Sequence, residues 1–406
     1  MSKKGKTALV PKLRFQEFSS SGEWKVSSLH SLAVKITNKN KERSITRILT
    51  NSAIDGVVDQ SEYFEREIVT QSNIDNYFVI DEGDYVYNPR ISTSAPVGPI
   101  SKNKIGKGIM SPLYTVFRFN NPRNDFYEQY FKTNLWNSYL KTVSNTGARH
   151  DRISISTENF MSMPLPYPSG KEQQKIADCL SSLDSLIAAE DKKLAALKLH
   201  KKGLMQKLFP AEGKTLPEWR FPEFRDCGEW ALCQIKDFAK VTTGNKDTQN
   251  KVDNGEYPFF VRSQTVEKID TYTFDCEAIL TSGDGVGVGK NFHYIVGKFD
   301  FHQRVYCIYD FKNSVIGKFV YQYFSENFQK RVMQLSAKNS VDSVRMSMIT
   351  DMPICMPKLK EQQKIADCLS NADEVITAQE EKIKALKIHK KGLMQGLFPS
   401  IDEVGE

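Results

Sequence analysis

The stretch KEQQKIADCLSSLDSLIAAEDKKLAALKLHKKGLMQKLFP at residues 171–210 occurs a second time, as KEQQKIADCLSNADEVITAQEEKIKALKIHKKGLMQGLFP at residues 360–399. The two copies are identical at 28 of 40 positions, with a constant offset of 189 residues. Chance does not produce this identity, and a long internal repeat of this kind is the sequence signature of a repeated architecture. The chain is therefore built from two copies of one unit, each ending in this segment.

Apolar residues recur in both copies at the alternating spacing of three and four residues that is typical of a heptad seam. The seam residues are Ile176, Leu180, Leu183, Ile187, Leu194 and Leu197 in one copy and Ile365, Leu369, Ala372, Ile376, Ile383 and Leu386 in the other. One seam position is polar, Glu190 or Gln379, and a polar seam residue can fix register at a cost in stability. The pattern predicts helices over 171–202 and 360–391, each roughly 48 Å long at ~1.5 Å per residue.

We expect these two helices to form an intramolecular coiled coil. Two amphipathic helices, each packed on its own domain, would show the same heptad phase, so this alternative stays open. Ser169 and Glu172 predict a capping box at the first helix start, which Lys358 does not repeat in the second copy. Gly203 and Gly392 are expected just after the last helical turn.

A fainter repeat precedes each globular part. Arg14-Phe15-x-Glu17-Phe18 with Gly22-Glu23-Trp24 matches Arg220-Phe221-x-Glu223-Phe224 with Gly228-Glu229-Trp230, and we call each the lead-in motif. A weaker match pairs Gly83-Asp84 with Gly283-Asp284. Another pairs 152–155 with 345–348, and each of these two segments is expected to be a strand. The globular parts are much less alike than the helices.

Each globular part alternates short β-type runs with turns and then carries an aromatic-rich helical pattern. The expected strands include 85–87, 114–117, 258–261, 278–280 and 306–309, and the expected helices cover 124–143 and 315–335. The fold class is α+β. The expected division is 1–168, first globular domain with its lead-in; 169–210, first repeat helix; 211–357, second globular domain; 358–406, second repeat helix and tail.

Composition excludes several classes of protein. Charged residues make up 26% and hydrophobic residues 40% of the 406 residues, and no run of 18 apolar residues occurs, so no membrane span is expected. The basic start of the chain is not followed by an apolar core, which argues against a signal peptide. Seven cysteines without a Cys-x-x-Cys pair indicate reduced thiols and a cytoplasmic protein.

Basic and amide side chains interrupt both globular parts, and these residue types bind phosphates and the edges of guanine and adenine. A net charge of +7 agrees with such a partner without identifying it. The candidates for DNA contact are Lys39, Lys41, Arg43, Arg90, Lys104, Lys107, Asn145, Arg149, Arg152, Lys246, Arg262, Lys290, Lys338, Asn339 and Arg345. A solvated loop residue is the alternative for each, and a structural salt bridge is the alternative for Arg152 and Arg345.

No catalytic pattern accompanies these candidates. The segment 283–290 looks like a phosphate loop, but Asp284 stands where a Walker loop has its first glycine, and Asn291 follows the lysine where that loop has serine or threonine. No nucleotide site is therefore expected. The six histidines show no metal-ligand spacing, and there is neither an Asn-Pro-Pro-aromatic tetrapeptide nor a Gly-x-Ser-x-Gly motif. The chain is therefore expected to bind neither metal nor cofactor and not to be an enzyme.

With these motifs in place, the whole chain resembles the specificity subunit of type I restriction–modification enzymes. The resemblance rests on the lead-in motifs, on the helix starts EQQKIADCL at 172–180 and 361–369, and on the helix ends KKGLMQ at 201–206 and 390–395. It implies two target recognition domains, each reading half of a split, asymmetric site in double-stranded DNA. It also implies an antiparallel helix pair, related by the internal pseudo-two-fold repeat, on which two methyltransferase subunits dock.

The resemblance further implies that the partner subunits carry the cofactors. The methyltransferase subunits would use S-adenosylmethionine to methylate adenine N6, and restriction subunits, driven by ATP with Mg²⁺, would join them. Two other classes remain open: a stand-alone DNA-binding regulator, and an unrecognised nuclease. The first would bind DNA tightly without partners, and the second would cut plasmid in the presence of Mg²⁺.

Overall fold

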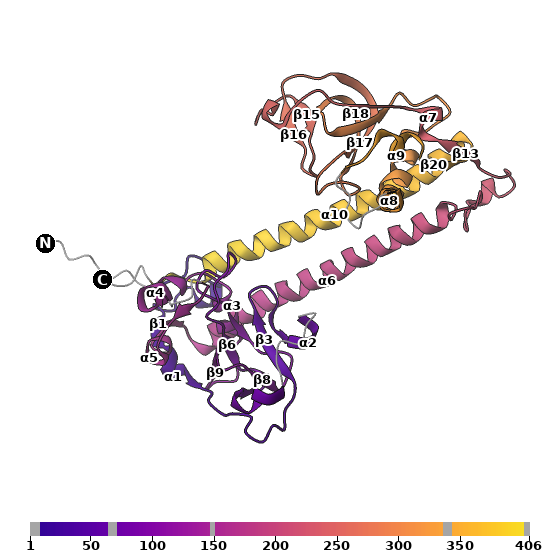
Figure 1. Cartoon of the computed structure of the whole chain (residues 1–406). Coiled ribbons are helices and arrows are strands. Elements are labelled where there is room, and N and C mark those ends of the chain that lie inside the picture. The colour runs from indigo at the N-terminus through magenta and orange to yellow at the C-terminus, as the bar shows by residue number, and fades with distance from the viewer. Residues whose placement is uncertain (1–8, 64–70, 147–150, 336–342, 402–406) are drawn as a thin grey trace. The chain divides into compact units, whose positions relative to one another are not determined.

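The computed structural model describes residues 9–63, 71–146, 151–335 and 343–401. The chain divides into two compact units, one made of residues 1–189 and 383–406 and the other of residues 190–382. Two uninterrupted helices, α6 (Gly170–Leu208) and α10 (Leu359–Leu397), each contribute one part to each unit (Figure 1). Every unit therefore holds one globular part and two helix segments.

The globular part of the first unit begins and ends in one small sheet, in which β1 (Lys25–Ser28) pairs antiparallel with β12 (Pro164–Tyr167). Two four-stranded sheets follow, in the orders β2-β9-β6-β7 and β4-β3-β8-β5. Their strands are β2 Ala33–Lys35, β3 Ile48–Ser52, β4 Gly56–Asp59, β5 Phe78–Ile80, β6 Tyr85–Tyr87, β7 Ile100–Lys102, β8 Gly108–Met110 and β9 Thr115–Phe119. The remaining elements are α1 Leu29–Leu32, α2 Gln60–Tyr63, α3 Asp125–Phe131, α4 Asn137–Val143, β10 Asn145–Thr146, β11 Ile153–Ser154, α5 Thr157–Met161 and the 3₁₀ turns Gln16–Phe18 and Gln71–Asn76.

The second unit repeats the small sheet, with β13 (Ala231–Gln234) paired to β20 (Pro353–Met356), but builds one six-stranded sheet in the order β14-β19-β17-β18-β15-β16. Its strands are β14 Lys240–Thr243, β15 Tyr257–Phe260, β16 Glu267–Ile269, β17 Phe274–Ser282, β18 Phe292–Phe301 and β19 Val305–Tyr309. Its helices are α7 Ile235–Phe238, α8 Gly317–Leu335, α9 Met346–Thr350 and the 3₁₀ turns Pro222–Phe224 and Thr248–Asn250. The expected α+β class is confirmed, and so are the strands expected at 85–87, 114–117, 258–261, 278–280 and 306–309.

The strand order corrects two matches drawn from the sequence. Both units share a three-strand arrangement, β2-β9-β6 in one and β14-β19-β17 in the other. Gly83-Asp84 precedes β6 whereas Gly283-Asp284 follows β17, so the two pairs are not equivalent. The match of 152–155 with 345–348 is also wrong, because Arg345 is the N-cap of α9 while β11 is a strand. The helix expected over 124–143 is divided into α3 and α4, where a turn intervenes.

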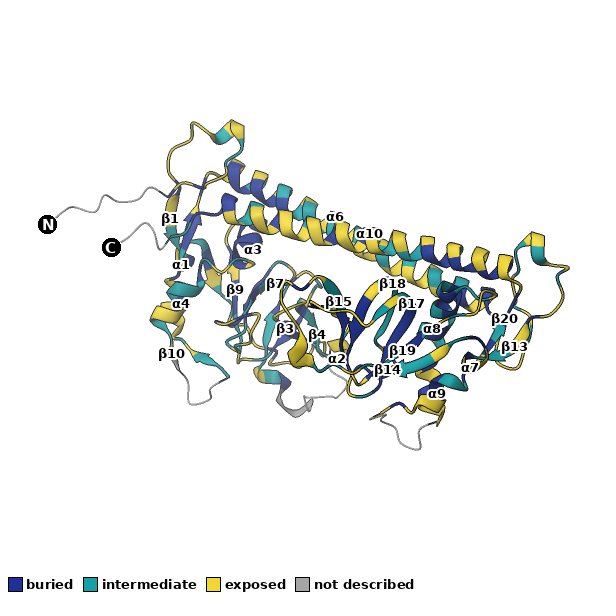
Figure 2. Cartoon of the chain, turned by 90° about the horizontal axis from the view of Figure 1, so that it is seen from above, coloured by how far each residue is buried: buried dark blue, intermediate teal, exposed yellow. Residues whose placement is uncertain are grey.

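The repeat helices are longer than the sequence indicated. Each has 39 residues, or roughly 58 Å at ~1.5 Å per residue. Gly203 and Gly392 lie inside the helices rather than after them, because the turns that follow are buried in the cores through Leu208 and Leu397. Figure 2 shows the burial along α6 and α10: residues near the helix ends are buried, and long stretches between them are exposed on the outer faces.

Within each unit the two helix segments run antiparallel. In the first unit, Asp184 forms an ion pair with Lys390, and Leu180 shares a core with Leu397. In the second unit, Lys201 Nζ lies 2.6 Å from Asp373 Oδ1, and residues 205–209 share a core with 365–369. The expected helix pair is confirmed. The alternative, amphipathic helices that pack on a globular domain, also holds in part, because the helix segments of each unit pack on the core of that unit.

The two polar seam residues meet each other. Gln379 Nε2 donates a hydrogen bond of 2.6 Å to Glu190 Oε2 and one of 3.1 Å to the Glu190 carbonyl oxygen. Lys382 adds an ion pair of 2.6 Å to the same carboxylate. Because Glu190 and Gln379 are equivalent in the repeat, this contact defines the register of the helix pair in the second unit.

Candidate nucleic-acid interface and partner surfaces

The lead-in motif and the start of the repeat helix form one joint, made twice. Arg14 donates to both carboxylate oxygens of Glu172 at 2.8 and 2.9 Å, and Arg220 does the same to Glu361 at 2.7 Å. The arginine side chains are about 10% exposed and the glutamates 2% and 1%. The hydrogen bonds to Glu361 raise the pKa of Arg220 above its ordinary value.

These contacts explain why each copy carries both the lead-in motif and the same helix start. Since Arg14 occupies the Glu172 carboxylate, the expected capping box is half made, with only the Ser169 hydroxyl accepting a bond from the Glu172 backbone, at 3.3 Å. The adjacent helix glutamines, Gln173 and Gln362, donate to the carbonyls of residues 168 and 357 at 3.0 and 2.8 Å. The repeated sequence therefore encodes a repeated clamp between chain segments and helix start.

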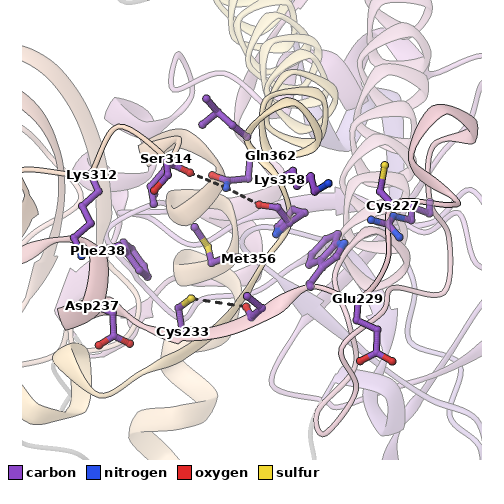
Figure 3. Close-up of a pocket in the computed structure, with 16 residues that line it drawn as sticks. Cys227, Glu229, Cys233, Asp237, Phe238, Lys312, Ser314, Met356, Lys358 and Gln362 are labelled. Carbon is purple, nitrogen blue, oxygen red and sulfur yellow. Dashed lines mark hydrogen bonds between the residues drawn. The ribbon is translucent and has the colours of Figure 1, made fainter.

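A cavity of about 560 Å³ adjoins this clamp in the second unit, between β13, the lead-in motif and the start of α10 (Figure 3). Its walls include Trp230, Cys233, Lys312 and Gln362, and Gln362 donates into two carbonyls there. A smaller cavity of about 300 Å³ lies at the equivalent place in the first unit. Burial raises the pKa of the Cys233 thiol, which keeps it protonated and a poor nucleophile.

The candidate cations of the first unit are exposed but mostly paired. Arg90 contacts Asp151 at 3.3 Å, Lys104 contacts Glu128 at 2.7 Å and Lys107 lies 4.0 Å from Asp81. Arg43 lies 3.7 Å from Asp75, and Lys39 donates to Asn76 at 3.2 Å, while Lys41 and Asn145 are exposed. Surface pairs of this kind contribute little stability, so phosphate oxygens can replace the carboxylates at small cost.

In the second unit, Arg262 and Arg304 lie 2.9 and 3.7 Å from the carboxylate of Asp284. Lys246 lies 3.8 Å from Asp300, whereas the side chains of Lys290 and Arg345 are exposed. The predicted contacts Arg149, Lys338 and Asn339 lie outside the described residues.

The structure thus gathers two arginine clusters that the sequence did not indicate. In the first unit, Asp151 lies between Arg90 and Arg152, the latter at 3.8 Å, and the two arginines also form a β-bridge. In the second unit, Asp284 lies between its two arginines. Both clusters lie where the loop after β6 or β17 meets the segment before α5 or α9. The alternative of a salt bridge therefore applies to Arg152. The aspartates gave no signal in the sequence, because phosphates and base edges are bound by basic and amide side chains.

Arg304 and Arg118 were both absent from the predicted contacts, and Arg118 has a different role from the clusters. Arg118 on β9 donates to the buried Asp84 at 2.6 and 2.9 Å and to Asp81 at 2.8 Å. These hydrogen bonds raise the pKa of Arg118 further above its ordinary value. Its role is to satisfy a carboxylate that is 0% exposed, which is structural.

The described residues provide neither a cluster of metal ligands nor a membrane-spanning helix. Among residues 9–63, 71–146, 151–335 and 343–401, no group of three or more His, Cys, Asp or Glu side chains is placed to hold a metal ion. In the same part of the chain, no helix is both long enough and apolar enough to cross a membrane.

Comparison with known proteins agrees with the repeat. The model of the type I restriction modification DNA specificity domain matches residues 21–199 and again 228–387. The MjaVIII specificity subunit of a type I restriction enzyme from Methanocaldococcus jannaschii is 26% identical over 321 residues, or 72% of this chain and 74% of the relative. The EcoDI specificity subunit of Escherichia coli is 29% identical over 157 residues, or 39% of this chain and 33% of the relative.

Solved structures show the same fold. The type I restriction–modification S subunit from M. genitalium has a TM-score of 0.66 over 97% of this chain and 100% of its own, at 12% identity. A chain from a type I restriction–modification complex has a TM-score of 0.53 over 93% of this chain and 97% of its own, at 16% identity. Because the family model covers most of the sequence in two successive matches, the chain belongs to the type I restriction–modification DNA specificity family and is a specificity subunit.

Proposed function

We propose that each unit reads one half of a split, asymmetric sequence in double-stranded DNA. The observation that supports this proposal is the contrast between the units. The joints built on Arg14 and Arg220 are alike, whereas one unit has two four-stranded sheets and the other a single six-stranded sheet. Two different surfaces on one repeated frame suit two unrelated half-sites. The arginine clusters provide the phosphate contacts in each unit.

The repeat helices set the gap between the half-sites in this proposal. Both helices are continuous over 39 residues, and the Glu190–Gln379 contact holds their register. Their length, roughly 58 Å, exceeds one turn of DNA, ~34 Å, so a gap of several base pairs is within reach. Helix length therefore determines the spacing.

The outer faces of the helices are the docking sites for two copies of one methyltransferase subunit. Leu199 is 70% exposed and its equivalent Ile388 is 62% exposed. Four residues further along each helix is a glycine, Gly203 or Gly392. A Cβ added to either glycine would meet nothing within 4 Å, so the helix surface there is open. An exposed apolar side chain beside an open glycine allows close approach of another helix, and its repetition supports two equivalent partners.

Catalysis and cofactors belong to the partners in this proposal. The methyltransferase subunits bind S-adenosylmethionine and methylate adenine N6, and the restriction subunits use ATP and Mg²⁺. This chain supplies recognition and spacing and carries out no reaction itself. Purified alone, it should leave plasmid uncut in the presence of Mg²⁺ and should bind its site in a gel shift more weakly than the assembled complex.

The test of the spacing is a matched deletion of one heptad from each helix, 186–192 and 375–381, which shortens both helices equally and removes both partners of the Glu190–Gln379 contact together. The helices shorten by about 10 Å, which corresponds to about three base pairs at ~3.4 Å each. Methylome sequencing of a host that expresses the variant with its methyltransferase should show a gap shorter by that amount, or no methylation. Methylation with an unchanged gap would refute the spacing role.

A further inference from the structure

The loop between β17 and β18 in the second unit carries an unusual side chain at its tip. Val286 is 94% exposed, the largest value for an apolar side chain among the residues that the structure describes. Gly285, with φ of +75°, and Gly287 flank it. In the first unit, β6 takes the place of β17, and the segment 88–99 that follows it contains no valine between two glycines, so this loop tip is a feature of the second unit.

The base of this loop is fixed. Val288 is 8% exposed and packs into the core of the unit, only two residues from the tip. Asn291 Nδ2 donates to the carbonyl of Arg262 at 3.1 Å and to Ser282 Oγ at 3.2 Å. A Cβ on Gly287 would lie 2.1 Å from that same amide nitrogen, which explains the glycine. Val286 is therefore presented to solvent from an anchored base.

Cations surround the base of the loop. Asp284, two residues before the tip, holds Arg262 and Arg304, whose side chains are 46% and 66% exposed. Lys290 at the other end of the loop is exposed as well. An apolar tip between cations matches the major groove, where phosphates flank base edges and where the C5-methyl of thymine is the one apolar group.

We propose that Val286 is a specificity-determining residue that contacts the C5-methyl group of a thymine in the half-site read by the second unit. The inference rests on the proposed function and adds the chemical group that is read. Arg262 and Arg304 hold the DNA backbone, and the valine discriminates thymine from cytosine by the presence of the methyl group. Burial of one methyl-sized group corresponds to about a fourfold change in affinity.

The test uses the complete complex of this chain with its methyltransferase and a duplex that contains the sequence identified by methylome sequencing. Each thymine is replaced in turn by uracil, which removes only the C5-methyl group, and affinity is measured by fluorescence anisotropy. Three complexes are compared: native, Val286→Ala, and the control Val296→Ala. Val296 is 67% exposed on β18 of the same unit, away from the loop. Neither substitution removes a buried side chain, so both variants should unfold at the native temperature.

One uracil replacement should weaken binding of the native complex and of Val296→Ala about fourfold, and should leave Val286→Ala unaffected. If native and Val286→Ala respond alike to every replacement, or if no replacement matters, the assignment is overturned while split-site recognition stands. If the native complex does not prefer its methylated sequence to an unrelated duplex, the proposed function itself fails.

Discussion

Removal of the Arg220 guanidinium tests the repeated joint. Arg220→Ala leaves the Glu361 carboxylate, 1% exposed, without its two charge-assisted hydrogen bonds. An unpartnered buried charge destabilises a fold by ~3–5 kcal/mol. For a unit of 193 residues, 190–382, each kcal/mol shifts the unfolding midpoint by ~2–4 °C, so the midpoint should fall by roughly 6–20 °C.

Hydrogen exchange measured by mass spectrometry locates the effect. Protection should fall in β13, β20 and the start of α10 in Arg220→Ala, and in β1, β12 and the start of α6 in the matched variant Arg14→Ala. The double variant Arg220→Met with Glu361→Leu replaces the pair by apolar side chains and should recover most of the loss, because no buried charge remains. A midpoint within 2 °C of native for Arg220→Ala would refute the role assigned to this pair.

Three further predictions concern the helices and one buried imidazole. Gly203→Ala and Gly392→Ala should each raise the free energy of unfolding, measured in urea, by ~1 kcal/mol, because alanine has the higher helix propensity and the added Cβ meets nothing. If these helix faces are docking sites, the same variants should bind the methyltransferase subunit more weakly in calorimetry. Unchanged binding would count against that surface. Replacing Glu190 and Gln379 together by leucine should preserve or raise stability yet loosen the register, visible as more than one cross-linked helix pairing; a single pairing would contradict the register role. Burial lowers the pKa of His302 from its usual 6.5, so the unfolded chain takes up this proton first as pH falls. The stability that the neutral imidazole contributes should be fully present above pH 6.5 and decrease as pH falls below it. His302→Gln should therefore reduce the slope of stability against pH in urea titrations, and a slope equal to native would refute this.

The sequence predicted those features that are encoded locally or written twice. The helix pair follows from heptad spacing, and the strands follow from alternating patterns such as 85–87 and 306–309, which the structure confirms. The joint between Arg14 and Glu172 was present in the sequence as two repeated motifs, although nothing showed that they touch.

Features set by distant contacts could not be predicted in the same way. The helices extend past Gly203 because Leu208 is buried, and burial depends on the whole unit. The order of strands placed Gly283-Asp284 after its strand, which no local pattern reveals. The arginine clusters required knowing that residues 90 and 152, or 262 and 304, lie near one aspartate. For Arg149, Lys338 and Asn339, DNA contact stays a prediction.

The proposed reading of one half of the DNA site by each unit can be tested in the complete system. The most direct measurement is methylome sequencing of hosts expressing the methyltransferase with either of two variants, Arg90→Ala with Arg152→Ala, or Arg262→Ala with Arg304→Ala. Because each arginine cluster positions its unit on the DNA backbone, the first pair should relax the sequence requirement at one half-site only, and the second pair should relax it only at the other. Equal loss at both halves in either variant would contradict the account.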